Sequence, residues 1–398
     1  MKSASTPNKE SNTMSHFTVL VIGSNVTEQL APYHEFECTG RNDQYVQDID
    51  KTAEEHADFL KEKEHKVRLA DGKIVDPYDP ICYREPTEEE LKDHPHMGGS
   101  GCDHKISWSS QDWGDGRGYC TKVHQLPDGA VEFEEPYANF LNYLLRYEDN
   151  NQKVVHHGET PILDGDKAPH KYGYILLDEK GEVTKVIRRT NPCAKWDWYT
   201  VGGRWMGFFK MKSGKKGVLG TPGVFDNTPE GDADIVLKGD IDFDQMRNDA
   251  GEKAGKIWDR VMDVFVGGGD DPDVKNHISW EAMRKKHGDE NIEAARKEYH
   301  DQISILGLKT SKDDEVRHMW EPDEILCKTR AEYVQEARDA AGCTFAVVKD
   351  GKWFERGEMG WWGCVSNEKE KDSWYKEFAN MIDALPDNTP LTVVDCHI

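Results

Sequence analysis

The chain has 398 residues, which is long for a single hydrophobic core and favours two lobes or one domain with large insertions. Only 36% of the residues are hydrophobic and 32% are charged, yet twelve Trp, thirteen Phe and fourteen Tyr predict an ordered core. The formal net charge of −24 repels phosphate backbones. It argues against general DNA or RNA binding and leaves metal cations and basic protein surfaces as counterparts.

The cysteines, the hydropathy and the first residues bear on the compartment. Nine cysteines are scattered without a C-x-x-C pair, a pattern typical of reduced thiols in a cytosol rather than of a disulfide framework. No run of about 18 apolar residues is present, so we expect no membrane span. Residues 1–13 lack the apolar stretch of a signal peptide, and we expect a disordered leader there.

The first third of the chain alternates strand patterns with polar segments. Residues 16–22 form a short β-branched run, which predicts a buried strand. Apolar residues at helical spacing predict an exposed helix over residues 42–64. Residues 67–75 flank Asp71-Gly72 with apolar residues and predict a hairpin. Residues 85–120 are rich in Gly, His, Asp and Ser, so we expect a loop-rich insertion there.

The middle of the chain adds helices and one more hairpin. Pro136 is expected to open an amphipathic helix, because proline is favoured at the first helical position. Residues 172–189 predict a second hairpin. Asp242 is expected to cap a long helix, and a charged helix is expected over residues 280–302. Together these helices predict a helical insertion or lobe at residues 236–328.

The last part of the chain has the clearest pattern. Thr329 and Glu332 form a capping box before a helical pattern. Residues 344–357 predict a hairpin, and a helix that carries Trp374 follows it. Residues 391–398 close the chain as a strand.

These elements predict an α+β fold with a central mixed or antiparallel sheet that contains both chain termini, and with helical and loop insertions. Residues 14–235 are expected to form an α+β part that carries the insertion at 85–120. Residues 236–328 are expected to form the helical lobe, and residues 329–398 to complete the sheet.

Several sequence blocks occur together: HFTVLVIG and QLAPY near the start, KWDWYTVGGRW, KGDIDF, ERGEMGWWG, and the closing LTVVDCHI. This combination resembles a family of proteins carried by many tailed bacteriophages. The resemblance spans nearly the whole chain and implies expression in the cytoplasm of a bacterial host. It also implies an accessory role such as host takeover, counter-defence or nucleotide metabolism, but it supplies no catalytic residue.

The stretch KWDWYTVGGRW, residues 195–205, is the first candidate site. In an extended segment Trp196 and Trp198 would share one face. The glycine pair can present adjacent N–H groups to an anion, and the arginine adds a planar donor fork. The pattern predicts a site for a nucleotide-like ligand; the alternative is a core corner in which Asp197 and Arg204 pair. The candidate ligand-binding residues are Trp196, Asp197, Trp198, Gly202, Gly203, Arg204 and Trp205.

Two further groups could carry chemistry. Glu355 and Glu358 lie near a glycine bend and could form a catalytic carboxylate pair or bind a divalent metal. The alternative is ion pairing with neighbouring basic residues. Cys102 and His104 could bind zinc together with His397 if their loop folds over the end of the last strand. The alternative is ordinary surface histidines and a buried cysteine.

From these observations we expect a phage accessory protein of the host cytoplasm that binds a host protein or a small nucleotide-like ligand. Such a binder would serve host takeover or counter-defence. One alternative is a metal-dependent or acid–base enzyme, a hydrolase or transferase, that acts on a nucleotide-like substrate. A second alternative, suggested by the charge of −24, is an acidic mimic of nucleic acid.

Overall fold

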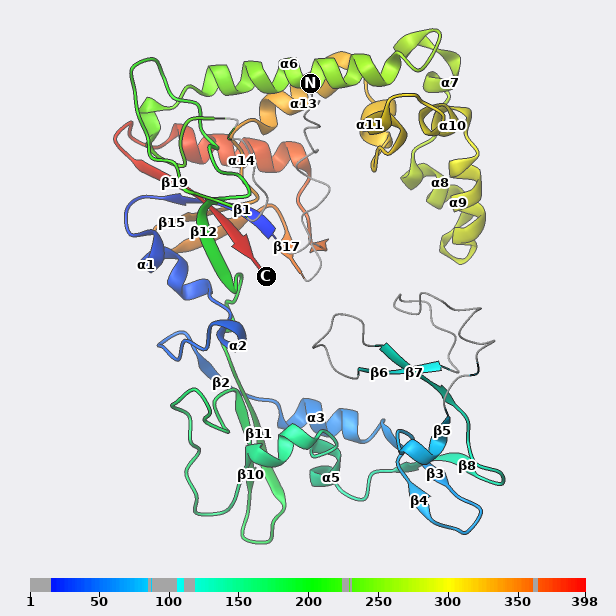
Figure 1. Cartoon of the computed structure of the whole chain (residues 1–398). Helices are drawn as coiled ribbons and strands as arrows, with labels where there is room; N and C mark the ends of the chain where they lie inside the picture. Colours follow the sequence, from blue (N-terminus) through cyan, green and yellow to red (C-terminus); the bar gives the residue numbers. More distant parts are fainter. Residues whose placement is uncertain are drawn as a thin grey trace. The chain divides into compact units, whose positions relative to one another are not determined.

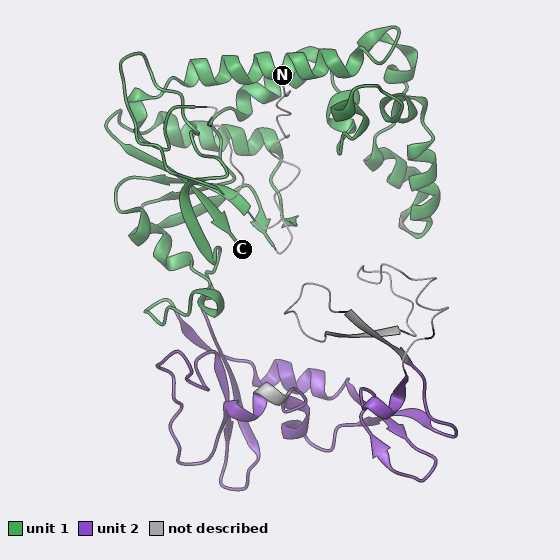
Figure 2. Cartoon of the chain, viewed as in Figure 1, with its two compact units in different colours: residues 1–45, 191–398 green, residues 46–190 purple. Residues whose placement is uncertain are grey.

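The computed structural model describes residues 16–84, 87, 106–110, 119–223, 229, 231–360 and 364–398. The described chain forms two compact units (Figure 2). Unit 1 contains the residues up to Tyr45 together with residues 191–398, and unit 2 contains residues 46–190. The leader expected at residues 1–13 and most of the insertion expected at 85–120 lie outside the described residues.

The division into units differs from the sequence-based boundaries, which kept residues 14–235 in one part. The strands of residues 46–190 form sheets with one another, and the named strands of unit 1 form theirs separately. Unit 2 is therefore inserted in the sequence of unit 1, between the segment that carries β1, α1 and α2 and residue 191. The chain passes from one unit to the other after Tyr45 and again before Asn191. No periodicity in the sequence marks these two boundaries, because strand pairing rather than a local pattern defines them.

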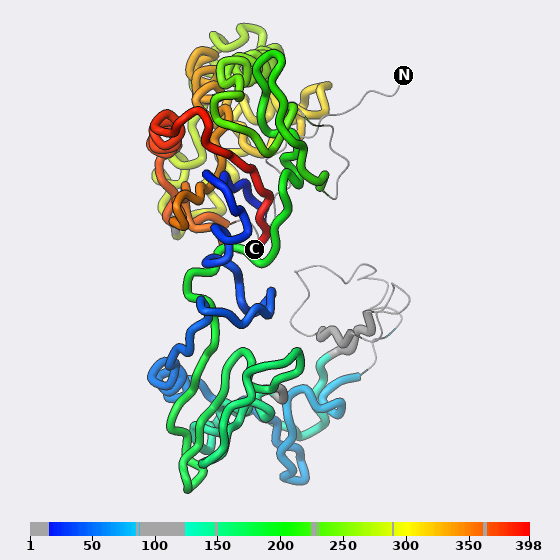
Figure 3. Tube along the Cα trace, turned by 90° about the vertical axis from the view of Figure 1, so that its left-hand side faces the viewer, coloured from blue at the N-terminus to red at the C-terminus, as the bar shows by residue number. Residues whose placement is uncertain are grey.

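A mixed sheet lies at the centre of unit 1, in the order β13-β12-β19-β1-β15-β16. Strand β1 is antiparallel to β19 along its length and parallel to β15. Strands β1 and β19, the first and last strands of the described chain, are thus neighbours in one sheet, as Figures 1 and 3 show, and the expected α+β fold is confirmed. The strands are β1 (His16–Ile22), β12 (Trp198–Gly203), β13 (Thr221–Pro222), β14 (Ile235–Leu237), β15 (Ala346–Lys349), β16 (Lys352–Glu355) and β19 (Pro390–His397), with β14 paired to β19.

Both faces of this sheet carry a hydrophobic core, which explains why all seven residues of β1 are buried. On one face, α14 (Lys371–Asp383) packs Trp374 and Phe378 against Leu20 and Val347. Burial of each such side chain stabilises the fold by roughly 1.5–3 kcal/mol. On the other face, Leu30 at the end of α1 (Val26–Leu30) packs with the alternate residues of β1. The short helix α2 (Phe36–Thr39) follows.

The expected hairpin and capping box near the C-terminus are confirmed. Strands β15 and β16 are joined across Asp350 and Gly351, which both have positive φ, as a type I′ turn requires. Thr329 caps α13 (Arg330–Ala340), and the reciprocal bond from Glu332 completes the capping box. A small hairpin of β17 (Glu358–Met359) and β18 (Val365–Ser366) lies between β16 and α14.

A long helix and several short ones form the helical part of unit 1. Helix α6 (Phe243–Met262) begins after Asp242, whose side chain accepts a hydrogen bond from the Gln245 N–H, as expected. Helix α13 packs along α6. The single helix expected at 280–302 is instead two helices, because the chain turns at Gly288 with φ +79°. The short helices, called the helical lobe below, are α7 (Pro272–Lys275), α8 (Trp280–His287), α9 (Ile292–His300), α10 (Ile303–Lys309), α11 (Asp314–Arg317) and α12 (Asp323–Leu326).

The described part of unit 2 contains three small sheets and two short α-helices. Its two expected hairpins are present, β3 with β4 and β10 with β11. Two expectations are wrong: a strand, β2, precedes the helix within residues 42–64, and Pro136 ends β8 instead of opening α5, which Asn139 caps. The elements are β2 (Gln47–Asp50), α3 (Thr52–Phe59), β3 (Lys63–Arg68), β4 (Ile74–Val75), β5 (Tyr83–Arg84), β6 (Ile106–Ser110), β7 (Tyr119–His124), β8 (Val131–Pro136), α5 (Phe140–Leu144), β9 (Val154–Val155), β10 (Gly173–Leu177) and β11 (Val183–Thr190).

Across the described parts of both units, every helix is too short or too polar to cross a membrane.

Candidate functional site: a pocket in the helical lobe

The tryptophans of residues 195–205 have different roles. Trp196 is only 4% exposed, and its indole N–H donates to the Leu30 carbonyl at 3.0 Å. Trp198 is 43% exposed and stacks on the His397 ring. The expectation that both share one face is wrong, because β12 begins at Trp198 and strand alternation does not extend to Trp196.

The glycine pair adjoins carboxylates of the protein itself. Gly202 and Gly203 have φ of +80° and +57°, and a Cβ at Gly203 would lie 2.3 Å from the Asp395 Cβ. The Arg204 N–H donates to Asp395 Oδ2 at 2.9 Å, and the Trp205 N–H donates to the Gly202 carbonyl at 3.1 Å. The glycine turn was predicted to bind the anion of a ligand. It packs instead against the Asp395 carboxylate of the protein itself.

A second internal carboxylate supports the same turn. Asp234 is fully buried and accepts backbone N–H bonds from Gly207 at 3.0 Å, Phe208 at 2.9 Å and Gly220 at 2.8 Å. Hydrogen bonds of this kind to an ionised acceptor are stronger than neutral ones. Asp234 therefore ties together two loop segments, at residues 207–208 and at Gly220.

The other candidate residues from the sequence are dispersed. Glu355 accepts from Lys195 at 2.7 Å and from the Trp353 indole at 2.7 Å. Glu358 is exposed and accepts from Asn367 at 3.1 Å. The two carboxylates thus belong to separate hydrogen-bond networks in different hairpins.

Of the three expected zinc ligands, only His397 lies in the described part of the chain. Cys102 and His104 lie outside the described residues. The His397 Nδ1 lies 2.9 Å from both oxygens of Asp197, so these two residues form an ion pair when the histidine is protonated.

Two groups of three potential metal ligands occur in the described chain, each within 4.8 Å. One is Glu35, Cys38 and Asp197. Burial, followed by the charge of Glu35, raises the pKa of the Cys38 thiol to about 11, which disfavours the thiolate that a metal needs. The other group is His277, Asp323 and Cys327.

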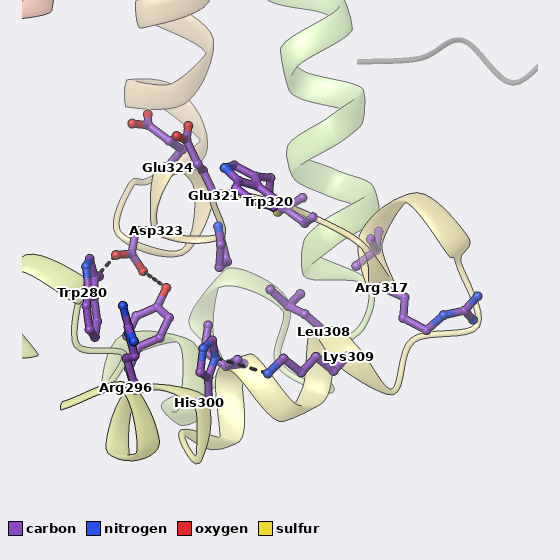
Figure 4. A pocket seen from close by; sticks show the side chains of 15 residues that line it. Trp280, Arg296, His300, Leu308, Lys309, Arg317, Trp320, Glu321, Asp323 and Glu324 are labelled. Atoms are coloured by element: carbon purple, nitrogen blue, oxygen red, sulfur yellow. Dashed lines mark hydrogen bonds between the residues drawn. The ribbon is translucent and has the colours of Figure 1, made fainter. Parts of the chain in front are cut away.

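The helical lobe contains a pocket of about 720 Å³ that sequence reasoning did not find (Figure 4). This volume lies within the roughly 300–1,000 Å³ of small-molecule sites. Residues from α8, α9, α10, α11 and α12 line it, together with the segment between α11 and α12. Aromatic, basic and acidic side chains all contribute to the lining.

The aromatic surface comes from three residues. Trp280 and Tyr299 meet edge to face, with ring centroids 5.5 Å apart. Trp320 lies in the segment before α12 and is 83% exposed, which is unusual for a tryptophan. The pocket therefore offers two indole rings, one anchored in the lobe and one accessible to solvent.

Asp323 organises one wall of the pocket. It accepts hydrogen bonds from the His277 Nε2 at 2.7 Å, the Tyr299 hydroxyl at 2.7 Å and the backbone N–H of Trp280 at 2.6 Å. Burial alone would raise the pKa of Asp323, but the hydrogen bonds outweigh it and lower this pKa. The pKa of Tyr299 is raised by burial and by the bond to Asp323.

His277 belongs to the same network. Its Nδ1 lies 2.8 Å from the Ser304 hydroxyl, and its Nε2 is bonded to Asp323. Because both ring nitrogens already have partners, a metal at the His277, Asp323 and Cys327 group would have to displace a short hydrogen bond. We therefore interpret this group as a structural network that orients the pocket wall.

The basic side chains of the pocket differ in how they are paired. Arg296 lies 3.6 Å from Glu293, and Arg317 is paired with Asp314. Lys309 donates to the His300 Nδ1 at 3.2 Å and forms no ion pair with any described residue. Figure 4 shows Lys309 and His300 together on the side opposite Glu324 and Trp320. Lys309 is thus a cation available to an anionic ligand.

The acidic lining is likewise divided. Glu324 binds Lys328 at 2.7 Å and Lys371 at 2.9 Å, which largely neutralises it. Glu321 makes no side-chain hydrogen bond within the described part of the chain and remains an available acceptor. The pocket thus combines aromatic faces, one available cation and one available carboxylate.

No protein-family model matches the chain, and no match is found among curated proteins or solved structures. The fold and the site themselves therefore define the class of protein. It is a two-unit α+β protein with a mixed central sheet and a helical lobe that contains a ligand-sized pocket.

Proposed function

We propose that the protein binds a small nucleotide-like ligand in the helical-lobe pocket, that is, a flat heterocycle bearing an anionic group. The observation that carries the proposal is the presence of Trp280, Trp320 and Lys309 around one pocket of about 720 Å³. This volume suits a ligand of nucleotide size.

Each part of such a ligand has a counterpart in the lining. A heterocycle stacked on an indole gains about 1–3 kcal/mol per ring. Lys309 supplies a cation for a phosphate, and the Glu321 carboxylate can accept from an amino or ring N–H group. The overall charge of −24 repels anions at long range, so a local cation is needed for binding.

The biological setting is proposed on the sequence resemblance alone. A phage accessory protein in the cytoplasm of a bacterial host would use such a pocket to capture a nucleotide-like host signal, in counter-defence or host takeover. Interaction with a host protein is a second candidate, favoured by the exposed Trp320, because tryptophan is common at binding hot spots.

Isothermal titration of the full chain with a panel of linear and cyclic nucleotides tests the binding proposal. We expect saturable binding of at least one nucleotide at one site, weakened about tenfold by Lys309→Ala, a loss of roughly 1.4 kcal/mol. Lys312→Ala removes the same charge from an exposed position that does not line the pocket, and it should leave binding unchanged.

Two results would count against the proposal. One is the absence of binding across the panel; the other is equal weakening by Lys309→Ala and Lys312→Ala, which would indicate only general electrostatics. Conversion of the nucleotide during the titration would favour the enzyme alternative, and co-purification of a host protein that requires Trp320 would favour the second candidate.

A further inference from the structure

Two histidines from opposite ends of the chain meet at one end of the central sheet. The pairing of β1 with β19 places His16 directly opposite His397. Their ring centroids are 4.8 Å apart, with the rings nearly perpendicular. This juxtaposition depends only on the sheet register and is independent of the helical-lobe pocket.

Each of these histidines is held by a carboxylate through the same ring nitrogen. The His16 Nδ1 lies 2.8 Å from Asp395 Oδ1, and the His397 Nδ1 lies 2.9 Å from Asp197. A neutral imidazole that donates its Nδ1–H to a carboxylate presents the lone pair of Nε2. Carboxylates commonly orient metal-binding histidines in this way.

The Nε2 atoms of both residues are available. Neither atom forms a hydrogen bond within the described part of the chain. Neither is among the buried side-chain atoms without a partner there, whereas Nε2 of His170 is. His397 is 29% exposed, whereas His16 is 8% exposed. Trp198 stacks on His397 at 5.2 Å and meets His16 edge-on at 5.1 Å, so an indole covers one side of the pair.

We propose that His16 and His397 bind one divalent transition-metal ion of the zinc class through their Nε2 atoms. Zn–N bonds of roughly 2.0–2.1 Å place an ion about 3.2 Å from the centroid of each bound ring. The two centroids are 4.8 Å apart, within the roughly 6.4 Å that two rings bound to one such ion can span.

The charges around the pair also favour a cation over an anion. Asp395 is 1% exposed and Asp197 adds a second carboxylate, so two negative charges lie behind the two rings. The nearby Lys195 is engaged by Glu355 at 2.7 Å. Two imidazoles supply one protein ligand fewer than the three of open zinc sites, so water or oxygens of a substrate would complete the coordination of the ion.

Zinc titration of the full chain, after removal of bound metal with a chelator, tests this site. We expect one equivalent of Zn²⁺ to bind, and His397→Ala to weaken binding at least tenfold. The fold should survive, because the His397 side chain is 29% exposed. Asp197→Asn should weaken binding by roughly 10–100-fold, because Asp197 only positions the ligand.

Matched variants distinguish this site from the neighbouring cysteine and from surface histidines. Cys38→Ser removes the thiol of the adjacent Glu35, Cys38 and Asp197 group, and His157→Ala removes a histidine that is 60% exposed; both should bind zinc like the wild type. With Co²⁺ as the probe, we expect a visible spectrum of nitrogen and oxygen ligation without a sulfur charge-transfer band.

The proposal is overturned if the wild-type chain binds no zinc, if His397→Ala binds it as tightly as the wild type, or if Cys38→Ser abolishes binding. His16→Gln provides a second loss-of-ligand variant. A folded His16→Gln protein that retained full zinc affinity would also contradict the proposal.

Discussion

The end of the central sheet and the helical lobe both contain buried histidine–carboxylate pairs, but they use them differently. In the lobe, the two ring nitrogens of His277 are hydrogen-bonded to Ser304 and Asp323, so the ring stabilises the wall of the pocket. At the sheet end, His16 engages Asp395 with one nitrogen and leaves the other available. The partner of the second ring nitrogen, rather than the pair itself, thus indicates whether such a histidine supports the fold or can bind a ligand.

The two regions also differ in how the chain builds them. The sheet end joins residues from β1 and β19 through strand register, and the buried Asp395 holds His16, which lies 379 positions away in the sequence. The lobe is built from helices of four to nine residues around its own core. We therefore expect substitutions at the sheet end to affect global stability, and substitutions in the lobe to affect local stability or binding.

The largest effect is expected for Asp234→Ala in the central sheet region, just before β14. This substitution removes the acceptor of three backbone N–H bonds, one buried and two partly buried, at a cost of about 1–3 kcal/mol each. Chemical denaturation should show a loss above about 4 kcal/mol or failure to fold. Asp232→Ala, which removes one bond to the Met211 N–H, is the milder control. Equal stability of the two variants would show that Asp234 does not hold these segments together.

A smaller, local loss of about 2–4 kcal/mol is expected for Asp323→Ala in the lobe, because it removes the acceptor of three hydrogen bonds. Hydrogen exchange should report the opening mainly in α8, α9 and α12. Protection lost equally in β1 and β19 would show that the lobe and the sheet unfold as one.

The same carboxylate gives the lobe a pH dependence. The pKa of Asp323 in the folded protein lies below the ordinary value of 3.8, so its contribution to stability is present above that pH and is lost as the pH falls through the folded pKa. Between pH 5 and pH 3 the wild type should therefore lose more lobe stability than Asp323→Ala does. Parallel losses in acid would assign the effect to other carboxylates.

Trp320→Ala should reduce nucleotide affinity about tenfold through lost stacking, while the free energy of unfolding changes by less than about 0.5 kcal/mol. The small stability change follows from the 83% exposure of Trp320. Titration calorimetry and denaturation of the same preparation measure both quantities. A large loss of stability would show that Trp320 supports the fold and is not a binding surface.

The smallest effect is expected for Trp198→Ala. Its stacking on His397 is partly exposed, so we expect a loss of about 1 kcal/mol in unfolding and no change in nucleotide affinity. Titration with the nucleotide that binds the wild type checks this directly. A tenfold loss of nucleotide affinity in Trp198→Ala would indicate that the nucleotide binds at residues 195–205.

Much of the fold could be predicted because its signals are local. The capping box at Thr329, the turn at Asp350-Gly351 and the β-branched run of β1 each identify an element within a few residues. The site could not be predicted in the same way. Trp280, Lys309 and Trp320 come from separate segments with no shared motif, and the meeting of His16 with His397 depends on a register that no local pattern specifies.

The stretch at residues 195–205 shows how a correct local inference can point to the wrong partner. Gly202 and Gly203 adopt positive φ, and the backbone N–H of Arg204 donates to a carboxylate, as in an anion-binding turn. The acceptor, however, is Asp395 of the same chain, which lies 191 positions away. Composition cannot distinguish an internal anion from a ligand.

A crystal structure of the chain with its tightest-binding nucleotide would show where the ligand lies. We predict that the heterocycle stacks on Trp280 or Trp320 and that the phosphate lies beside Lys309, within the helical-lobe pocket. A nucleotide bound instead against Trp198, Gly203 or Arg204, with the lobe pocket unchanged, would contradict nucleotide binding in the lobe.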